Sequence, residues 1–141
     1  MANVATFADV EQLLIDHLFP GFEDDDPEKP VVGTKIPNPR PDAFYRVQRT
    51  GGVRRTRFTD APIVVLESWG SDEAEAIEMA ETGRTAMANL QGESLEGATP
   101  DDIHQVYDVT ESSGLINLPD PLSDQARYTQ TFELHIRGVM P

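Results

Sequence analysis

The fold is decided by the run Ile63-Val64-Val65-Leu66-Glu67-Ser68-Trp69, the most strand-like stretch of the sequence. Its first residues are apolar on both faces, which is typical of a strand in the middle of a sheet. The residues Gly70-Ser71-Asp72 lead into a helix that we expect over residues 72–90, with acidic side chains at its positive end. Small residues recur along this helix and predict that it packs closely against the sheet; they are Ala76, Ala80 and Gly83.

Further strands are expected on both sides of this helix. The patterns of apolar residues predict short strands over residues 31–36, 43–50, 53–59, 103–109 and 126–139. Strands gathered on both sides of one long helix favour a single α+β domain over residues 1–141, not a doubly wound parallel sheet.

The segments between these elements carry turn and loop signals. Gly51-Gly52 predicts a tight hairpin turn, and residues 110–125 predict a long connection. A first helix is expected over residues 6–19, capped by Thr6 and ended by Pro20-Gly21, because proline has no backbone N–H to continue the helix.

Composition excludes several classes of protein. The chain has 141 residues, 25 acidic and 11 basic, so its net charge is −14, the opposite of a typical nucleic-acid binder. It has no cysteine, which excludes disulfides, thiolate metal sites and a cysteine nucleophile. No apolar run approaches the ~20 residues that span a bilayer, and the first residues do not resemble a signal peptide. We therefore expect a cytosolic product without membrane contact.

The sequence carries no recognisable catalytic signature. The three histidines fall on different predicted elements: His17 near a helix end, and His104 and His135 on the solvent faces of strands. The acidic run 23–28 lacks the order of a calcium-binding loop. Nucleophile-elbow and phosphate-loop motifs are missing. We expect no catalytic residue, no metal and no cofactor, and hence no enzyme.

Charge is distributed unevenly along the chain. Residues 35–57 hold seven basic residues and one acidic residue, a net charge of +6, which leaves −20 for the rest. A chain this polarised is suited to attract copies of itself, although a solvated hairpin or an anion-binding hairpin would show the same pattern. The candidate interface residues are Arg46, Arg49, Arg54, Arg55, Arg57 and Trp69. Trp69, the only tryptophan, is either a core residue or an interface anchor.

The chain resembles the tail terminator proteins of long-tailed bacteriophages (siphophages), especially those of actinobacterial hosts. The resemblance covers nearly the whole chain in element order, with motifs of moderate specificity. The stretches that carry it are the helix 10–19 ending at Pro20-Gly21, Val32-Gly33-Thr34-Lys35-Ile36-Pro37, Pro39-Arg40-Pro41, Phe44-Tyr45-Arg46-Val47, Gly51-Gly52, residues 63–69 with the acidic helix after them, Gly114-Leu115, Leu118-Pro119-Asp120-Pro121 and Ala126-Arg127-Tyr128.

The resemblance implies a compact sandwich of one mixed, mostly antiparallel sheet packed by two helices. It implies a structural virion protein at the neck-proximal end of the tail, assembled in the host cytoplasm. Such proteins form a hexameric ring that caps the tail tube, stops its polymerisation and joins the tail to the head–neck connector. No activity or cofactor is implied, and the partners are other copies, the tail tube protein and the connector. Acidic residues around the channel would keep passing DNA from sticking.

Two other functions remain open from the sequence. A small-molecule-binding α+β pocket protein would need an apolar cavity, which five aromatic residues would line: Tyr45, Trp69, Tyr107, Tyr128 and Phe132. An acidic mimic of DNA would need carboxylates spread over one face, and the basic segment 35–57 argues against it.

Overall fold

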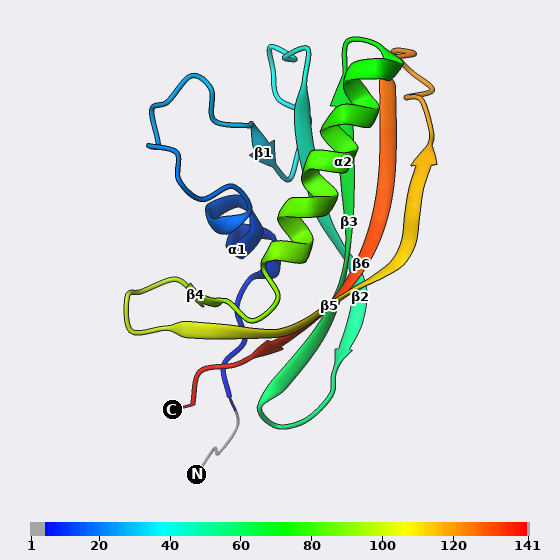
Figure 1. Ribbon diagram of the computed structural model, residues 1–141. Helices are drawn as coiled ribbons and strands as arrows, with labels where there is room; N and C mark the ends of the chain where they lie inside the picture. The colour runs from blue at the N-terminus through cyan, green and yellow to red at the C-terminus, as the bar shows by residue number, and fades with distance from the viewer. Residues whose placement is uncertain (1–4, 141) are drawn as a thin grey trace.

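One six-stranded sheet, with both helices on the same face, forms the protein in the computed structural model, which describes residues 5–140 (Figure 1). The elements are α1 (Val10–His17), β1 (Val32–Gly33), β2 (Phe44–Arg54), β3 (Thr59–Gly70), α2 (Glu73–Asn89), β4 (Ser94–Glu96), β5 (Ile103–Asn117) and β6 (Ala126–Arg137). The strand order is β1-β2-β3-β6-β5-β4. Only β1 and β2 pair in parallel. The expected α+β fold, with one mixed and mostly antiparallel sheet and two helices, is therefore confirmed.

The run that decides the fold lies in β3, in the interior of the sheet as predicted. β3 pairs with β2 on one side and with β6 on the other. Val64 and Leu66 are buried in the core that the helices cover. Glu67 and Trp69 alternate with them and point to the opposite, helix-free face.

The close packing of α2 depends on its small residues, as predicted. Asp72 caps the helix by accepting a hydrogen bond from the Glu75 backbone N–H at 2.8 Å. Its buried residues are Ala76, Ala80, Gly83 and Met87. A Cβ atom at position 83 would lie 2.8 Å from Leu66 Cδ2 and 2.9 Å from a Tyr45 ring carbon. Gly83 therefore allows the helix to approach the sheet.

The first helix is shorter than predicted, and a different residue caps it. α1 begins after Asp9, whose carboxylate accepts hydrogen bonds from the backbone N–H groups of Glu11 and Gln12 at 3.1 and 3.3 Å. Thr6, the predicted cap, instead pairs through its backbone with Val139. The prediction was wrong because this pairing holds Thr6 in extended backbone, one turn before the helix starts.

The β2–β3 hairpin is longer than predicted. Gly51-Gly52 does not form the turn; it lies inside β2 at a register shift that follows Arg49. Gly52 has a φ of 93°, and a Cβ there would lie 2.1 Å from the Ala61 carbonyl oxygen. The turn itself spans residues 55–58, so the strand predicted over residues 53–59 was wrong: its ends belong to β2 and β3 and its middle is the turn. There the Thr56 hydroxyl accepts hydrogen bonds from the backbone N–H groups of residues 58 and 59, both at 3.1 Å.

Other strand limits also differ from prediction, most of all those of β1 and β5. β1 comprises only Val32–Gly33 of the expected 31–36. β5 continues to Asn117, so half of the expected connection 110–125 is strand. Two register shifts against β6, between Glu111 and Ser113 and between Ser113 and Ile116, accommodate the Ser- and Gly-containing sequence of this half. On β6, Phe132, Leu134 and Ile136 are buried, as the alternating pattern predicts.

Candidate interaction surfaces

The end of the β2–β3 hairpin carries three exposed arginines. We call residues 53–58 the tip. All six are exposed, and they comprise Val53, Arg54, Arg55, Thr56, Arg57 and Phe58. The hairpin extends past both helices, so the tip stands at one end of the molecule (Figure 1). The tip therefore combines positive charge with exposed apolar groups.

Arg46, a predicted interface residue, belongs to an internal ion cluster. Its guanidinium donates to both carboxylate oxygens of Glu67, at 2.5 and 3.0 Å. Arg127 donates to the same carboxylate at 2.9 Å. The Glu67 side chain is only 5% exposed. The register of β2, β3 and β6 brings these three residues together on the helix-free face. Arg46 therefore stabilises the folded chain by pairing with a buried carboxylate.

Two more of the arginines predicted to form an interface are instead paired with carboxylates of the same chain. Arg49 donates to Asp60 at 3.1 Å, across the register shift in β2. Arg55 donates to Glu133 at 2.6 Å on the helix-free face. This hydrogen bond, followed by one from His135, holds the pKa of the Glu133 carboxyl below its ordinary value. Arg49 thus stabilises the hairpin, while Arg55 is half exposed and joins the tip to the sheet.

Arg54 and Arg57 are the two predicted interface arginines whose charge is not compensated by a carboxylate of the described chain. Among residues 5–140, no carboxylate lies within 4.0 Å of either guanidinium. The Arg54 guanidinium lies over the Phe7 ring, 4.7 Å from its centroid, which fixes its position without neutralising it. These two side chains give the tip its free positive charge.

Trp69 is a core residue, so the expectation that it anchors an interface is wrong for the folded chain. Its side chain is fully buried. Its ring stacks on Phe44 at a centroid distance of 5.0 Å. The guanidinium groups of Arg40 and Arg127 lie 5.4 and 5.2 Å from the ring centroid. Trp69 therefore has no surface to offer a partner.

An apolar groove lies between the end of α1 and α2. Its volume is about 490 Å³. Its lining includes Leu18, Phe19, Phe22 and Leu95, together with the exposed Thr85 of α2. No local sequence pattern predicts this groove, because it joins residues about seventy positions apart in the chain.

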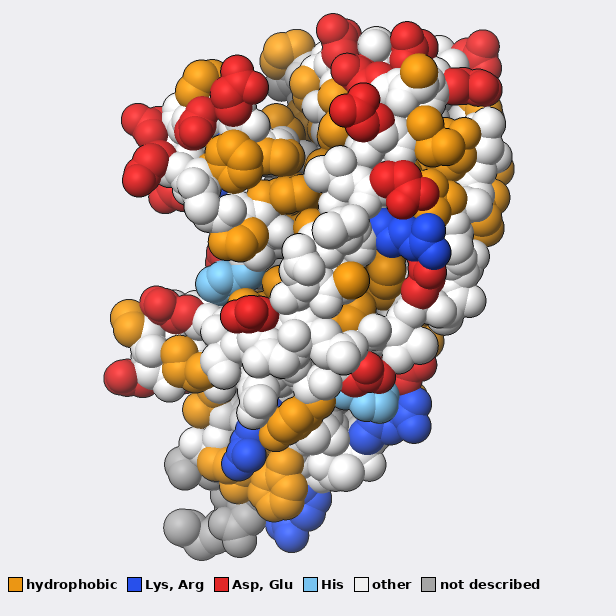
Figure 2. All heavy atoms as spheres, in the orientation of Figure 1, with side chains coloured by type: hydrophobic (Ala, Val, Ile, Leu, Met, Phe, Trp, Pro, Cys, Tyr) orange, Lys and Arg blue, Asp and Glu red, His pale blue; other side chains and the backbone are white. Residues whose placement is uncertain are grey.

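Acidic residues border this groove. The α1–β1 loop that follows Phe22 carries Glu23, Asp24, Asp25, Asp26 and Glu28; within residues 5–140 only Asp24 of these forms an ion pair, with Lys29. Figure 2 shows acidic side chains over this loop and over the start of α2 at the upper end of the molecule. Basic side chains gather at the lower end around the hairpin. In this view the acidic loop and the basic end of the hairpin therefore lie at different ends of the molecule.

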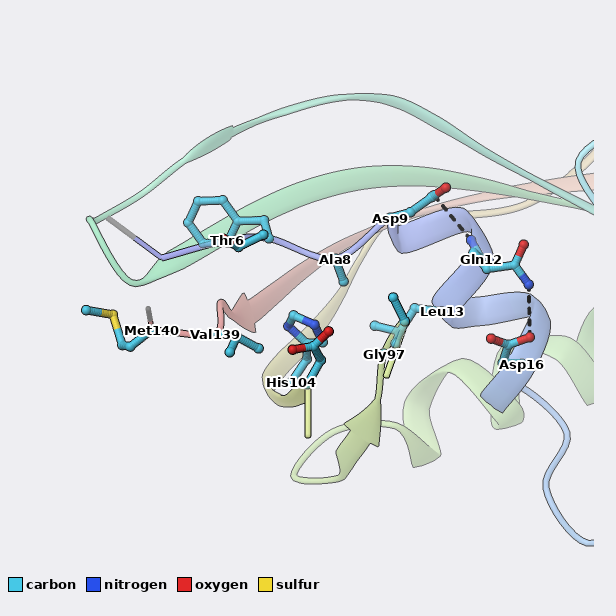
Figure 3. Close-up of a pocket in the computed structure, with 13 residues that line it drawn as sticks. Thr6, Ala8, Asp9, Gln12, Leu13, Asp16, Gly97, His104, Val139 and Met140 are labelled. Carbon is cyan, nitrogen blue, oxygen red and sulfur yellow. Dashed lines mark hydrogen bonds between the residues drawn. The ribbon is translucent and has the colours of Figure 1, made fainter. Parts of the chain in front are cut away.

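A second cavity, of about 410 Å³, lies beside α1 (Figure 3). Asp9, Gln12 and Asp16 of α1 line one side, and His104 lies opposite. These polar groups already have partners: the Gln12 amide donates to Asp16 at 2.9 Å, and His104 Nδ1 donates to the Arg137 carbonyl oxygen at 2.9 Å. The cavity is therefore lined by groups that serve local structure.

The histidines lie on three different elements, α1, β5 and β6. His17 is in the last turn of α1, as expected, and its Nε2 donates to the Glu96 carbonyl oxygen at 2.6 Å. His135 is half buried on the helix-free face, near Glu133. His104 is buried, 3% exposed, so its predicted place on a solvent face was wrong. Within residues 5–140, no three His, Asp or Glu side chains are grouped so that they would hold a metal.

The five aromatic residues proposed to line a small-molecule pocket do not meet around one cavity. Neither cavity described above is lined by any of them. Tyr45 is buried under α2, where its hydroxyl donates to the Met79 carbonyl oxygen at 2.7 Å, and burial raises its pKa. Trp69 is buried on the other face of the sheet, and Tyr107 is exposed.

Comparison with known proteins adds no relative. No protein-family model matches the chain, and no curated protein matches its sequence. In the described part of the chain, no helix is long and apolar enough to cross a membrane. The interpretation of function therefore rests on the surfaces described above.

Proposed function

We propose that this protein is a structural subunit that associates with copies of itself, head to tail, in a ring of the tail terminator type. One observation carries the proposal: at one end the chain presents a tip with two arginines that pair with no carboxylate among residues 5–140, and at the other end an acidic loop. Surfaces that complement each other but lie on different parts of one molecule favour heterologous contacts, which close into a ring when the rotation divides the circle.

The resemblance to tail terminators suggests where this ring would be located in a phage particle. A ring of six copies would cap the end of the phage tail tube, stop its polymerisation and present its other side to the head–neck connector. The mature location would be the neck-proximal end of the virion tail. The observed fold, one mixed sheet packed by two helices, agrees with the fold that the resemblance implies.

The large acidic excess suits a channel through which DNA passes. Each chain contributes a net charge of −14. Carboxylates around a central opening would repel phosphates over about 8 Å at physiological salt, so the DNA would pass without sequence-specific binding. A ring whose lumen is lined by basic residues would contradict this part of the proposal.

The test combines mass measurement and tube capping. The purified chain is measured by native mass spectrometry, alone and with polymerising tail tube protein, and tube ends are viewed by electron microscopy. We expect a hexameric species and tubes that stop growing once their ends are capped. A chain that stays monomeric and leaves tube growth unchanged would overturn the proposal.

One observation favours a second candidate, a small-molecule-binding protein: the cavity beside α1 has a volume typical of ligand sites. A thermal-shift screen of small polar metabolites tests it. A ligand whose stabilisation is lost in Ala98→Trp, a larger side chain at an exposed position of the cavity lining, would favour this candidate over the ring.

A further inference from the structure

We propose that the tip of one copy inserts into the groove between α1 and α2 of the next copy. This inference rests on the proposed ring, and it names the contact that builds it. The occupant of the groove is thus a second copy of this chain, and the contact repeats because every chain has one tip and one groove.

The tip has the chemistry of a ligand for that groove. Val53 is 68% exposed and Phe58 is 43% exposed, so both hold apolar surface in water. Arg54 and Arg57 stand beside them without a carboxylate partner among residues 5–140. The Thr56 hydrogen bonds fix the turn. The tip is thus a pre-formed apolar knob with two positive charges, which lowers the entropy cost of docking.

The groove has the complementary chemistry. Phe19, Phe22 and Leu95 supply apolar walls, and Phe22 is 39% exposed. Glu93 lies in the lining, and the acidic residues 23–28 begin directly after Phe22. In Figure 2, hydrophobic side chains gather between the α1–β1 loop and α2, with acidic side chains beside them. An apolar floor with an acidic rim matches a knob that carries two arginines.

The tip cannot reach the groove of its own chain. Its backbone is tied at the other end of the molecule, because the Ala5 N–H donates to the Arg57 carbonyl oxygen at 3.3 Å and the Gly138 N–H donates to the Phe58 carbonyl oxygen at 2.8 Å. In Figure 1 the end of the β2–β3 hairpin lies beyond both helices, whereas the residues that line the groove belong to or follow those helices. Complementary surfaces that cannot meet within one chain are left to meet between chains.

A cross-linking experiment tests the contact directly. The chain has no cysteine, so single cysteines report without background. We mix Val53→Cys, at the tip, with Thr85→Cys, on the exposed wall of the groove, and add a short bis-maleimide. The control pair is Val53→Cys with Thr110→Cys, an exposed position on β5. We expect a tip–groove heterodimer and a much weaker control band. Equal bands, or no tip–groove band, would overturn the inference.

Charge exchange supplies a second test that needs no cross-linker. Arg54→Glu/Arg57→Glu at the tip and Glu23→Lys/Asp25→Lys at the groove rim should each weaken self-association by at least about tenfold. An equimolar mixture of the two variants should regain it, because each altered surface then meets an altered partner. Lys35→Glu, with the same kind of charge reversal outside both surfaces, should associate as the unaltered chain does. Unchanged association of either double variant would overturn the inference.

The failure of this contact is distinguishable from the failure of the ring. If the unaltered chain forms a hexamer but the tip and groove do not cross-link, the ring stands and this contact is wrong. If the tip cross-links to tail tube protein in place of Thr85→Cys, the tip faces the tube and this contact is again wrong. A chain that neither associates nor caps tubes overturns both proposals.

Discussion

Gly83 of α2 lies directly over Leu66 of β3, so closely that a Cβ at position 83 would be 2.8 Å from Leu66 Cδ2. Gly83→Val should therefore lower the free energy of unfolding by about 1–3 kcal/mol, because overpacking outweighs the gain in helix propensity. Urea unfolding followed by circular dichroism measures this change. Gly114→Ala is the matched control, since a Cβ there meets no atom within 4 Å. An unchanged midpoint for Gly83→Val would contradict the packing.

The shared carboxylate of Glu67 gives a second prediction. Glu67→Gln should leave Arg46 and Arg127 without their common anion, and it should destabilise the fold by about 3 kcal/mol, as expected when one partner of a largely buried ion cluster is removed. The same urea titration measures the effect. Glu81→Gln, which removes an exposed carboxylate beside Arg84, is the control and should change stability little. Equal effects of the two variants would show that the Glu67 cluster is not a structural centre.

The cap of α1 gives a third prediction, which separates two residues. Asp9→Ala should cost about 1 kcal/mol, because two backbone N–H groups lose their acceptor. Thr6→Ala should cost little, since Thr6 acts through its backbone. Thermal unfolding of both variants compares them. A larger effect at Thr6 would restore the helix start that the sequence suggested.

The contact between Arg55 and Glu133 predicts a pH dependence. The pKa of Glu133 is lowered in the folded chain, chiefly by the hydrogen bond from Arg55. The ionised carboxylate therefore contributes stability above its unfolded pKa of about 4.3, and this contribution is lost as the pH falls through the lower folded value. Arg55→Gln should accordingly be less stable than the unaltered chain at neutral pH, and the difference should shrink on acidification.

Thermal unfolding across a pH series measures this difference for Arg55→Gln. Arg57→Gln is the control, because no carboxylate among residues 5–140 pairs with Arg57, and its effect should not vary with pH in this range. A difference for Arg55→Gln that persists unchanged into strong acid would show that Glu133 is not its functional partner.

Local patterns predicted the parts of the fold in which one signal dominates. The apolar run in β3 and the small residues of α2 agree with their positions in the structure, because burial on one face fixes the period of a strand or helix. The prediction of a tight turn at Gly51-Gly52 was wrong, because a glycine pair is typical of both a tight turn and an irregularity within a strand. The strand irregularity is favoured here because Gly52 lies close to the Ala61 carbonyl oxygen. That contact can be recognised only when the pairing of the two strands is known.

The candidate surface was predicted in sign but not in detail. The sequence shows that residues 35–57 are basic, yet it cannot show that Glu67, Asp60 and Glu133 neutralise three of the arginines. Those pairs depend on cross-strand register, which is set by contacts between distant residues. The groove was missed for the same reason, and His104 was misplaced because its face is set by the pairing of β5 with β4 and β6.

Because Trp69 is buried between Phe44 and two guanidinium groups, its intrinsic fluorescence reports on whether the chain is folded. The chain has one indole, so its fluorescence comes from a single place on the helix-free side of the sheet. Unfolding would expose that indole to water and shift its emission to longer wavelength. Docking at the distant hairpin would leave the emission wavelength of Trp69 unchanged. Unfolding and subunit association can therefore be distinguished in one unlabelled sample.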